Sequence, residues 1–546
     1  MRPPSSPAMP CQWMAAWWPA SITPMPDLIR AEYLICDPDL LEASVITDGA
    51  LVIDAGKVIA AGPWAELRTD YSHLTPLGGP RDWLVIPGLI NAHHHGRGIA
   101  TESVGMQDAP LELWLPGFML YPNFDTYWNT LYTAARMLRS GITASVQSHS
   151  STGPFPAYRE SVERALAAYH DAGVRVSFAL GHHDQNVMAA YVSDEEFLGS
   201  LPLALQVEAR HWFHYPDIYI STDQYFTLFE ELWHRCKQAY PRARLLFSPV
   251  GLQWASDALL SRLAAAARDY ATGVHLHLLE TKYQCTYVYR RFGCTAVEVL
   301  QKFDLLGPGT SLAHAIWLAE HELSSLAAAG ATVVTNTSSN LRLGSGLLPL
   351  SALRTHGVKV ALGLDSTSLF DDEDMLKEMR LVSTLHRRPG LERDWPSSYE
   401  VLRMATVGGA GVALLAGEAG KLLPGYNADI TVLRLDRIRR PYVDPAVDPV
   451  GFALGRAVRA DVDTVLVGGE VLVRNGELTR LDLARIEAEL GNPQNDEHAN
   501  RARRRLLRDL QPHIHTLYER WVPERLEPYY PSNSRISYHK ERHHGH

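Results

Sequence analysis

The amino-acid sequence predicts an α/β protein with a (β/α)8 barrel in its middle and one discontinuous β-domain formed by both flanks of the chain. Apolar, strand-like runs alternate with amphipathic, helix-like segments over roughly 300 residues, which is the pattern of such a barrel. Short strand–turn–strand runs stand before and after this middle part. A doubly wound sheet would alternate in the same way, but no Gly-x-Gly-x-x-Gly motif lies between a strand and a helix.

The two flanks carry matching hairpin patterns. "DGALVIDAGKVIAAG" (48–62) predicts a hairpin with Ala-Gly at its turn, and "VDTVLVGGEVLVRNGEL" (462–478) predicts another with Gly-Gly at its turn. "GYNADITVLRLD" (425–436) adds a further strand. We therefore expect residues 28–86 and 420–480 to be the two parts of one β-domain.

The barrel is expected over residues 87–419. Several helix-like segments in this part end in Gly, as helix C-termini commonly do. The candidate strands are "WLVIPGLINAHHH", "GITASVQSHS", "VRVSFALGHHD", "RLLFSPVGL", "GVHLHLLE", "TSLAHAIW", "ATVVTNTSSN" and "KVALGLDS".

The two ends of the chain have a different character. Residues 1–27 lack a clean run of seven apolar residues, so we interpret them as an N-terminal extension rather than a signal peptide. Residues 481–546 are expected to be a helical C-terminal extension, whose Arg-rich helix presents a solvated face or a subunit contact. No stretch reaches the ~18 apolar residues of a membrane-spanning helix, so no membrane partner is expected.

Composition excludes some partners. The formal net charge is −10 and no long block of one sign occurs, which disfavours nucleic acid and leaves a small molecule as the expected partner. The five cysteines are scattered without a Cys-x-x-Cys pair, which favours reduced thiols and a cytoplasmic protein.

Functional side chains of a (β/α)8 barrel gather at the C-terminal ends of its strands. The first predicted strand ends at His93, His94 and His95. Residues i and i+2 of a strand point to the same side, so His93 and His95 can share one metal ion while His94 faces elsewhere. Adjacent histidines also occur by chance, so this triplet alone does not decide between a metal site and packing.

Other strand ends supply more candidates. His277 lies near the end of the fifth strand, with Glu280 after it, and His275 is expected deeper as a packed, hydrogen-bonded residue. His314 ends the sixth strand and Asp365 follows the eighth. Each would be unremarkable alone, but together they place metal ligands, an acid and a base at one end of the predicted barrel.

This set of residue types suits one chemistry. Imidazoles and a carboxylate bind a single divalent ion, zinc first, with iron, cobalt or manganese as alternatives. Such an ion makes water a nucleophile near neutral pH. Glu280 is then expected to act as general base and general acid, His314 to polarise the substrate or hold the hydroxide, and Asp365 to accept a proton.

A family resemblance runs in order from Leu28 to Leu478. The sequence resembles the amidohydrolase superfamily, above all its cytosine-deaminase-like and triazine-hydrolase-like branch of metal-dependent hydrolases. The motifs that carry this resemblance are "VIPGLINAHHH", "VHLHLLET", "LAHAIWLAEHEL", "SSNLRLGSGLLPL", "VALGLDS", "MATVGGA" and "LLPGYNADITVLRLD". The resemblance implies a distorted (β/α)8 TIM barrel with a β-sandwich domain, a mononuclear metal and a homo-oligomer.

Carried over position by position, the resemblance also implies roles. The metal ligands would be His93, His95, His277 and Asp365, and the catalytic pair would be Glu280 and His314. Residues 338–340, "SSN", would form a loop near the substrate.

The sequence departs from the family pattern in two places. "SPVGLQWASD" has no His where the family often has one, and Asn336 stands where the family often has His or Cys. No Lys ends the fourth strand, which disfavours a binuclear centre.

The loop after the first strand, "MQDAPLELWLPGFMLYPNF" (106–124), is unusually apolar. It is either a lid packed on the barrel rim or a wall for an apolar or aromatic substrate. Few positive groups are expected at the site, which favours a small neutral molecule with a ring. The predicted substrate contacts are Gln107, Trp114, His149, His183, Trp254 and Asn340.

These observations predict a metal-dependent amidohydrolase that cleaves a non-peptide C–N bond of a small neutral, aromatic or heterocyclic molecule. The missing His of the fourth strand and the apolar rim favour an amide, urea or carbamate. A hydrolytic deaminase or dechlorinase of a heterocycle is the alternative. A non-catalytic binding protein on the same scaffold is a third hypothesis, because a fold does not imply a function.

Overall fold

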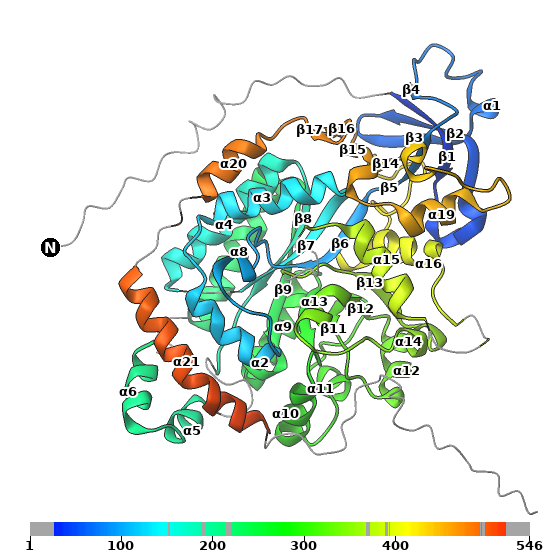
Figure 1. Cartoon of the computed structure of the whole chain (residues 1–546). Helices are drawn as coiled ribbons and strands as arrows, with labels where there is room; N and C mark the ends of the chain where they lie inside the picture. Colours follow the sequence, from blue (N-terminus) through cyan, green and yellow to red (C-terminus); the bar gives the residue numbers. More distant parts are fainter. Residues whose placement is uncertain are drawn as a thin grey trace, which may run out of the picture.

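The computed structural model describes residues 27–150, 153–186, 193–212, 220–366, 372–387, 391, 394–491, 493 and 497–519. The predicted N-terminal extension up to residue 26 and the part of the C-terminal extension after residue 519 lie outside these residues. Figure 1 shows a strand barrel surrounded by helices, with a smaller β-domain beside it.

The barrel is an eight-stranded parallel sheet in which each strand pairs with the next along the chain. The backbone N–H of Asp365, after β13, donates to the carbonyl of His93 in β6 at 3.0 Å, which joins the last strand to the first. Register shifts between β6 and β7 and between β9 and β10 distort the barrel. The strands are β6 (Leu89–His94), β7 (Ile142–Ser150), β8 (Arg175–Gly181), β9 (Ala243–Gly251), β10 (Val274–Leu278), β11 (Thr310–His314), β12 (Thr332–Thr335) and β13 (Lys359–Leu362).

Two of the predicted strands have other bounds in the structure: one is divided into two strands and the other is shorter. The run expected as one strand from Trp83 is two strands, β5 (Trp83–Pro87) in the β-domain and β6 in the barrel. The break falls at Gly88, whose N–H bonds to Asp429 and where a Cβ would lie 2.2 Å from Thr143 Oγ1. The run expected to extend to Asn340 stops at Thr335, and α13 (Thr337–Arg342) begins directly after Asn336.

Helices cover the outside of the barrel (Figure 1). Polar caps begin them: Asp125 accepts from two backbone N–H groups of α3, and Ser221 forms a capping box with Gln224 of α8. As predicted, several end at a Gly, for example α4 at Gly173 with φ +79°. The main helices of the barrel are α3 (Thr126–Arg139), α4 (Phe155–Ala172), α8 (Thr222–Ala239), α9 (Asp257–Asp269), α10 (Lys282–Phe292), α11 (Ala296–Lys302), α12 (Glu320–Ala329), α14 (Leu350–Thr355), α15 (Met375–Leu385) and α16 (Ser398–Arg403).

Both flanks of the chain form the smaller domain, as predicted. Its nine strands make one sheet, in which β5 from the N-terminal flank pairs antiparallel with β14 (Ile430–Arg434) from the C-terminal flank. The other strands are β1 (Leu28–Ile35), β2 (Val45–Asp54), β3 (Lys57–Pro63), β4 (Leu77–Gly78), β15 (Val462–Val467), β16 (Glu470–Arg474) and β17 (Glu477–Leu478). We keep the division of the domains at residues 86/87 and 419/420 as a proposal.

The two predicted hairpins of this sheet have the expected turns. Ala55 and Gly56 have φ +46° and +78°, and Gly468 and Gly469 have φ +57° and +79°. Positive φ at both central residues defines the turn that matches strand twist in a two-residue hairpin. The two turns also meet, because a Cβ on Gly56 would lie 2.7 Å from the carbonyl oxygen of Gly468. The sheet therefore folds over its own buried cluster.

The C-terminal extension is helical where the structure describes it. It comprises α20 (Leu483–Leu490), which packs on α3, and α21 (Glu497–Glu519). Helix α21 contacts α6 (Leu203–Trp212) and two elements of the loop after β6, namely α2 (Leu111–Trp114) and η4 (Leu115–Leu120). Its apolar side chains Leu506, Leu510 and Ile514 are buried, while Arg505 and Arg508 are exposed. The Arg-rich side is therefore solvated as expected, and the opposite side packs on this chain itself.

No helix within the described residues is long and apolar enough to cross a membrane.

Candidate metal centre

The C-terminal ends of the barrel strands share an unusual backbone. Val250, Leu279, His314 and Asp365 have φ between +48° and +70°, in the left-handed region that L-residues rarely adopt. Such backbone persists only where surrounding structure holds it, and it concentrates at functional sites. Here it ends the strand alternation at β9, β10, β11 and β13, beside the side chains that gather at this end of the barrel.

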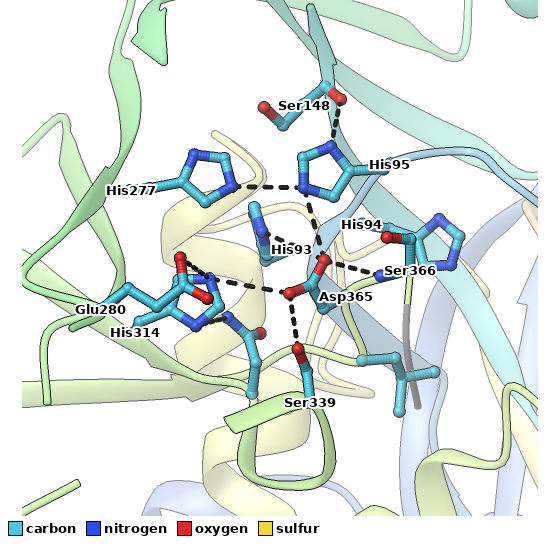
Figure 2. Close-up of polar contacts among 12 residues, drawn as sticks. His93, His94, His95, Ser148, His277, Glu280, His314, Ser339, Asp365 and Ser366 are labelled. Carbon is cyan, nitrogen blue, oxygen red and sulfur yellow. Dashed lines mark hydrogen bonds and ion pairs between the residues drawn. The ribbon is translucent and has the colours of Figure 1, made fainter. Parts of the chain in front are cut away.

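His93, His95, His277 and Asp365 converge at this point (Figure 2). His95 Nε2 lies 3.4 Å from Asp365 Oδ1 and 3.2 Å from His277 Nε2. His93 Nε2 lies 3.9 Å from the same carboxylate oxygen. These separations suit ligands around one cation, and two groups of three potential ligands, His93–His277–His314 and His93–His95–Asp365, have their ligating atoms within 4.8 Å.

The residues present fit a metal ion. Nε2 of His93 and Nε2 of His314 are fully buried without a hydrogen-bond partner among the described residues, although the rest of each ring is bonded. Buried polar atoms usually have partners, so orphaned lone pairs aimed at one point indicate a ligand. Nitrogen and carboxylate donors are the ligands that zinc and related divalent ions prefer.

Hydrogen bonds orient the histidines toward the centre. His95 Nδ1 lies 3.0 Å from the carbonyl of Ser148, and His277 Nδ1 lies 2.9 Å from the carbonyl of Val250. A carbonyl only accepts, so both Nδ1 atoms carry the proton and both Nε2 atoms present lone pairs. The tautomer required for metal binding is thus imposed by the barrel backbone.

A longer chain orients His93. Its Nδ1 lies 2.7 Å from His275 Nε2, and His275 Nδ1 lies 2.7 Å from Ser311 Oγ. Ser311 Oγ in turn donates to the carbonyl of Val274 at 3.4 Å. Because the Ser311 hydroxyl donates to the Val274 carbonyl, it accepts from His275 Nδ1–H. His275 Nε2 then accepts from His93 Nδ1–H, and Nε2 of His93 is left as a lone pair. His275 is the packed, hydrogen-bonded residue that the sequence predicts.

The protonation states also suit metal binding. Burial lowers the pKa of His277 to about 4, helped by repulsion from His314, and burial lowers the pKa of His93 and His95 well below the ordinary value. Burial would raise the pKa of Asp365, but the charges of His95 and His314 outweigh it and hold the pKa below its usual range. Neutral imidazoles therefore face an ionised carboxylate.

Glu280 faces the centre from the other side. Its side chain is buried, and its Oε2 lies 3.8 Å from His314 Nε2, which is itself 3.7 Å from Asp365 Oδ2. Burial raises the pKa of Glu280 well above its ordinary value, and the charges of Asp365 and Glu112 raise it further. A protonated carboxyl group can donate a proton, and an ionised one beside it can accept a proton. The pair therefore suits a reaction that needs both a general acid and a general base.

His94 is turned away from the centre, as strand alternation predicts. Its Nδ1 accepts from the N–H of Gly96 at 2.7 Å, so its Nε2 donates to Glu373 Oε2 at 3.0 Å. Both partners are buried. This pair ties the end of β6 to the segment before α15.

Three of the predicted substrate contacts lie around the mouth of the barrel. Trp114 is buried in the cluster formed by the loop after β6. His183 and Trp254 have their ring centroids 5.2 Å apart with the planes tilted by 31°. Burial lowers the pKa of His183 to about 3, helped by repulsion from His182 and His277. The loop after β6 therefore packs as a lid with its own apolar cluster, and these aromatic residues are available as walls.

The other three predicted contacts are placed differently. Gln107 is exposed. His149 has both ring nitrogens in hydrogen bonds, to Gln147 at 3.1 Å and to Ser161 at 3.0 Å. Asn340 is fully buried and accepts a 2.7 Å hydrogen bond from His314 Nδ1, so it orients a side chain of the candidate catalytic pair.

Sequence reasoning missed several residues of the site. Ser339 was expected only as part of a loop near the substrate, whereas it donates to Asp365 Oδ2 at 2.9 Å. Arg97 lies two residues beyond His95, but β6 ends at His94 and Gly96 has φ +66°, so strand alternation does not extend to it. No sequence signal pointed to Glu373.

Comparisons with known proteins find matches along most of the chain. A model of the amidohydrolase family matches residues 84–472. A 5'-deoxyadenosine deaminase of Methanothermobacter thermautotrophicus is 30% identical over 461 residues, which cover 82% of this chain and 95% of the relative. A 5-methylthioadenosine/S-adenosylhomocysteine deaminase of Pyrococcus furiosus is 29% identical over 453 residues, covering 82% of this chain and 94% of the relative.

Solved structures share the fold. Atrazine chlorohydrolase of Arthrobacter aurescens TC1, complexed with zinc, superposes with a TM-score of 0.71 at 24% identity, covering 85% of this chain and 99% of that one. An adenosine deaminase of Xanthomonas campestris with bound zinc gives 0.68 at 23% identity, covering 88% and 99%.

Proposed function

The chain belongs to the amidohydrolase family and is a metal-dependent hydrolase of C–N bonds, and we propose that its reaction is the hydrolytic deamination of a small aromatic heterocycle. The family and the enzyme class predicted from the sequence motifs are thereby confirmed. The observation that carries the proposal is the buried Glu280 carboxyl, which holds its proton within 3.8 Å of His314 and opposite the ionised Asp365.

The proposed ligands of the ion are His93, His95, His277 and Asp365, and the proposed ion is zinc, with iron, cobalt or manganese as alternatives. Support comes from the inward Nε2 lone pairs of the histidines and from the zinc present in two proteins of the same fold. When bound, such an ion lowers the pKa of water and polarises the carbon that is attacked.

The side chains of this protein then move the protons. Glu280 donates its proton to the ring nitrogen beside the attacked carbon and then takes a proton from the attacking water. Asp365 accepts the second water proton, which passes to the departing amine. A C–O bond forms, the C–N bond breaks, ammonia leaves and the attacked ring carbon becomes a carbonyl. His314, with Nδ1 bonded to Asn340, keeps Nε2 available to hold the oxygen.

The deaminase assignment is supported by the relatives, because both curated relatives are named as deaminases of adenosine derivatives. Trp114 and Trp254 are proposed as walls for a planar ring. Hydrolysis of an amide, urea or carbamate is the second candidate, favoured by the end of β9, where the segment from Ser248 to Trp254 has no imidazole to assist deamination.

The test is turnover by the metal-loaded protein. A panel of heterocyclic amines, chlorinated heterocycles, aryl amides, ureas and carbamates is assayed for ammonia, chloride and organic amines. Ammonia release supports deamination, organic amine release supports the second candidate, and chloride release supports dechlorination. Glu280→Gln should abolish turnover, whereas Glu477→Gln, whose side chain is 79% exposed on β17, should not change it.

We also propose a cytoplasmic homo-oligomer whose ligand is a small molecule. The four cysteines among the described residues are all unpaired, as expected of a reducing compartment. Leu203 and Val207, one turn apart on α6, are 75% and 63% exposed and offer an apolar strip for a subunit contact. Light scattering after size exclusion should give an oligomer for the wild type and a smaller species for Leu203→Glu/Val207→Glu.

A further inference from the structure

Arg97, in the loop after β6, is a cation with no anionic partner among the described residues. It lies two residues beyond His95 and is half-buried. Its guanidinium carbon lies 4.3 Å from the ring centroid of Phe118 and 6.0 Å from that of Tyr121, so it stacks on the lid. Among the described residues, no carboxylate and no hydrogen-bond acceptor binds its N–H groups.

Two other arginines that stack on a ring in this protein also pair with a carboxylate. Arg262 lies 4.1 Å over Phe226, and its Nη1 is 2.6 Å from Asp223. Arg291 lies 4.5 Å over Phe292, and its Nη2 is 2.6 Å from Asp257. Stacking on a ring leaves the edge of a guanidinium free, and in these two cases a carboxylate takes that edge.

Electrostatic effects show that Arg97 is close to the centre. Burial lowers the pKa of Arg97, and the charges of Tyr121 and Asp365 raise it. In the other direction, the charge of Arg97 contributes to the lowered pKa of His95. A guanidinium does not lose its proton in proteins, so a half-buried one remains a charge that requires an anion or water.

A second donor of the lid lacks a partner. Trp114 is 6% exposed, and its Nε1–H is buried without an acceptor among the described residues. The ring of Trp114 meets the same Phe118 ring that Arg97 covers, with centroids 4.7 Å apart. The Phe118 ring thus contacts both Arg97, a charged donor, and Trp114, a neutral donor.

We propose that Arg97, assisted by Trp114, binds a carboxylate group of the substrate, so that the enzyme acts on heterocyclic amines that carry a carboxylate substituent. This inference rests on the proposed function and replaces the neutral substrate expected from the sequence. A planar guanidinium edge matches the two oxygens of a carboxylate. The guanidinium carries one positive charge and the indole N–H carries none, so together they balance one negative charge. A carboxylate carries one negative charge, so it is favoured over a phosphate.

Turnover of matched compounds tests the inference. The probes are 9-(carboxymethyl)adenine and 1-(carboxymethyl)cytosine, each compared with its carboxamide. The wild type should prefer the carboxylate by about tenfold or more in kcat/KM, as expected for hydrogen bonds to a charged group. Arg97→Met should remove this preference, Trp114→Phe should reduce it, and Arg262→Met should preserve it. Equal kcat/KM for both members of each pair in the wild type would overturn the inference.

A binding measurement separates this inference from the reaction. Calorimetry compares phenylacetate with phenylacetamide on metal-loaded wild type, Arg97→Met and Arg262→Met, after metal analysis has shown equal occupancy. Arg97→Met should lose about tenfold in affinity for phenylacetate, while Arg262→Met should not. Unchanged phenylacetate affinity in Arg97→Met would overturn the inference. If no ammonia is released from any probe but Arg97→Met loses affinity for phenylacetate, the deaminase proposal fails and the carboxylate site stands.

Discussion

Ser339 Oγ donates a hydrogen bond of 2.9 Å to Asp365 Oδ2, while the backbone N–H of Ser366 binds the other carboxylate oxygen at 2.6 Å. The two bonds act on opposite oxygens and so fix the plane of the Asp365 carboxylate. The same helix, α13, presents Asn340 to His314. One short helix therefore orients both a proposed metal ligand and a proposed catalytic residue.

Ser339→Ala should weaken the metal site without unfolding the protein. It removes one hydrogen bond to a charged group, which is worth about 1.5–3 kcal/mol, so metal affinity or kcat should fall by about tenfold or more. Competition with a fluorescent chelator measures the affinity. Ser366→Ala is the matched control, because it keeps the backbone N–H that binds Asp365. Equal metal affinity in both variants would contradict the role of Ser339.

Asn340→Leu should lower kcat more than it changes KM. Leucine has a similar shape but cannot accept the proton of His314 Nδ1, so the tautomer and ring orientation of His314 are no longer fixed. Loss of such an outer partner typically costs about 10- to 100-fold in activity or metal affinity. Steady-state kinetics with a substrate found in the panel checks this. A variant with unchanged kcat would show that Asn340 does not orient His314.

Gly363→Ala should disrupt the centre through the backbone. A Cβ at this position, just beyond β13, would lie 2.2 Å from Asn336 Oδ1 and 2.9 Å from the Cβ of His93. Neither Asn336 nor His93 can move away easily to make room for the Cβ, because both are fully buried. Metal content per chain, measured by mass spectrometry, should fall. Gly411→Ala on α17 (Gly409–Val412) is the control, since a Cβ there meets nothing within 4 Å.

Glu378 should make stability depend on pH. Its carboxylate accepts from the N–H of Ser338 at the start of α13, yet burial raises its pKa from 4.5 to about 7. The folded state binds this proton more tightly, so the contribution of Glu378 to stability is present below pH 4.5 and is lost as pH rises through 7.

Glu378→Gln keeps an acceptor for Ser338 and removes the charge. Denaturant unfolding should therefore find it more stable than the wild type at pH 8, by up to about 3 kcal/mol, with the difference disappearing near pH 4.5. Glu477→Gln, exposed on β17, should show no such pH-dependent gain. A Glu378→Gln variant that is less stable at pH 8 would mean that the ionised form is the one stabilised by the fold.

Much of the barrel and of its centre was predictable because both follow simple periodicity. Eight apolar runs predicted eight strands, and the alternation of side chains along β6 separated His93 and His95 from His94. His277, His314 and Asp365 were found because the ends of parallel strands meet on one face of a barrel.

The features that were not predicted lie where the strand and helix periodicity of the sequence ends. The segment "TSSN" has the residue types of a loop, but it is the start of α13, whose capping involves Glu378, far along the chain. Arg97 and Glu373 act through contacts with distant segments, Arg97 with Phe118 and Glu373 with His94. Strand division at Gly88 is set by a close approach to Thr143. No local sequence pattern encodes these contacts between distant segments.

Helix α21 packs on α2 and η4, so the last described helix supports the loop that follows β6, the strand that carries His93. The two sides of this contact, residues 111–120 and 497–519, lie more than 370 positions apart in the sequence. An engineer who wishes to reshape this loop can therefore redesign the buried face of α21, around Leu506 and Leu510, and leave every ionisable group of the proposed chemistry untouched.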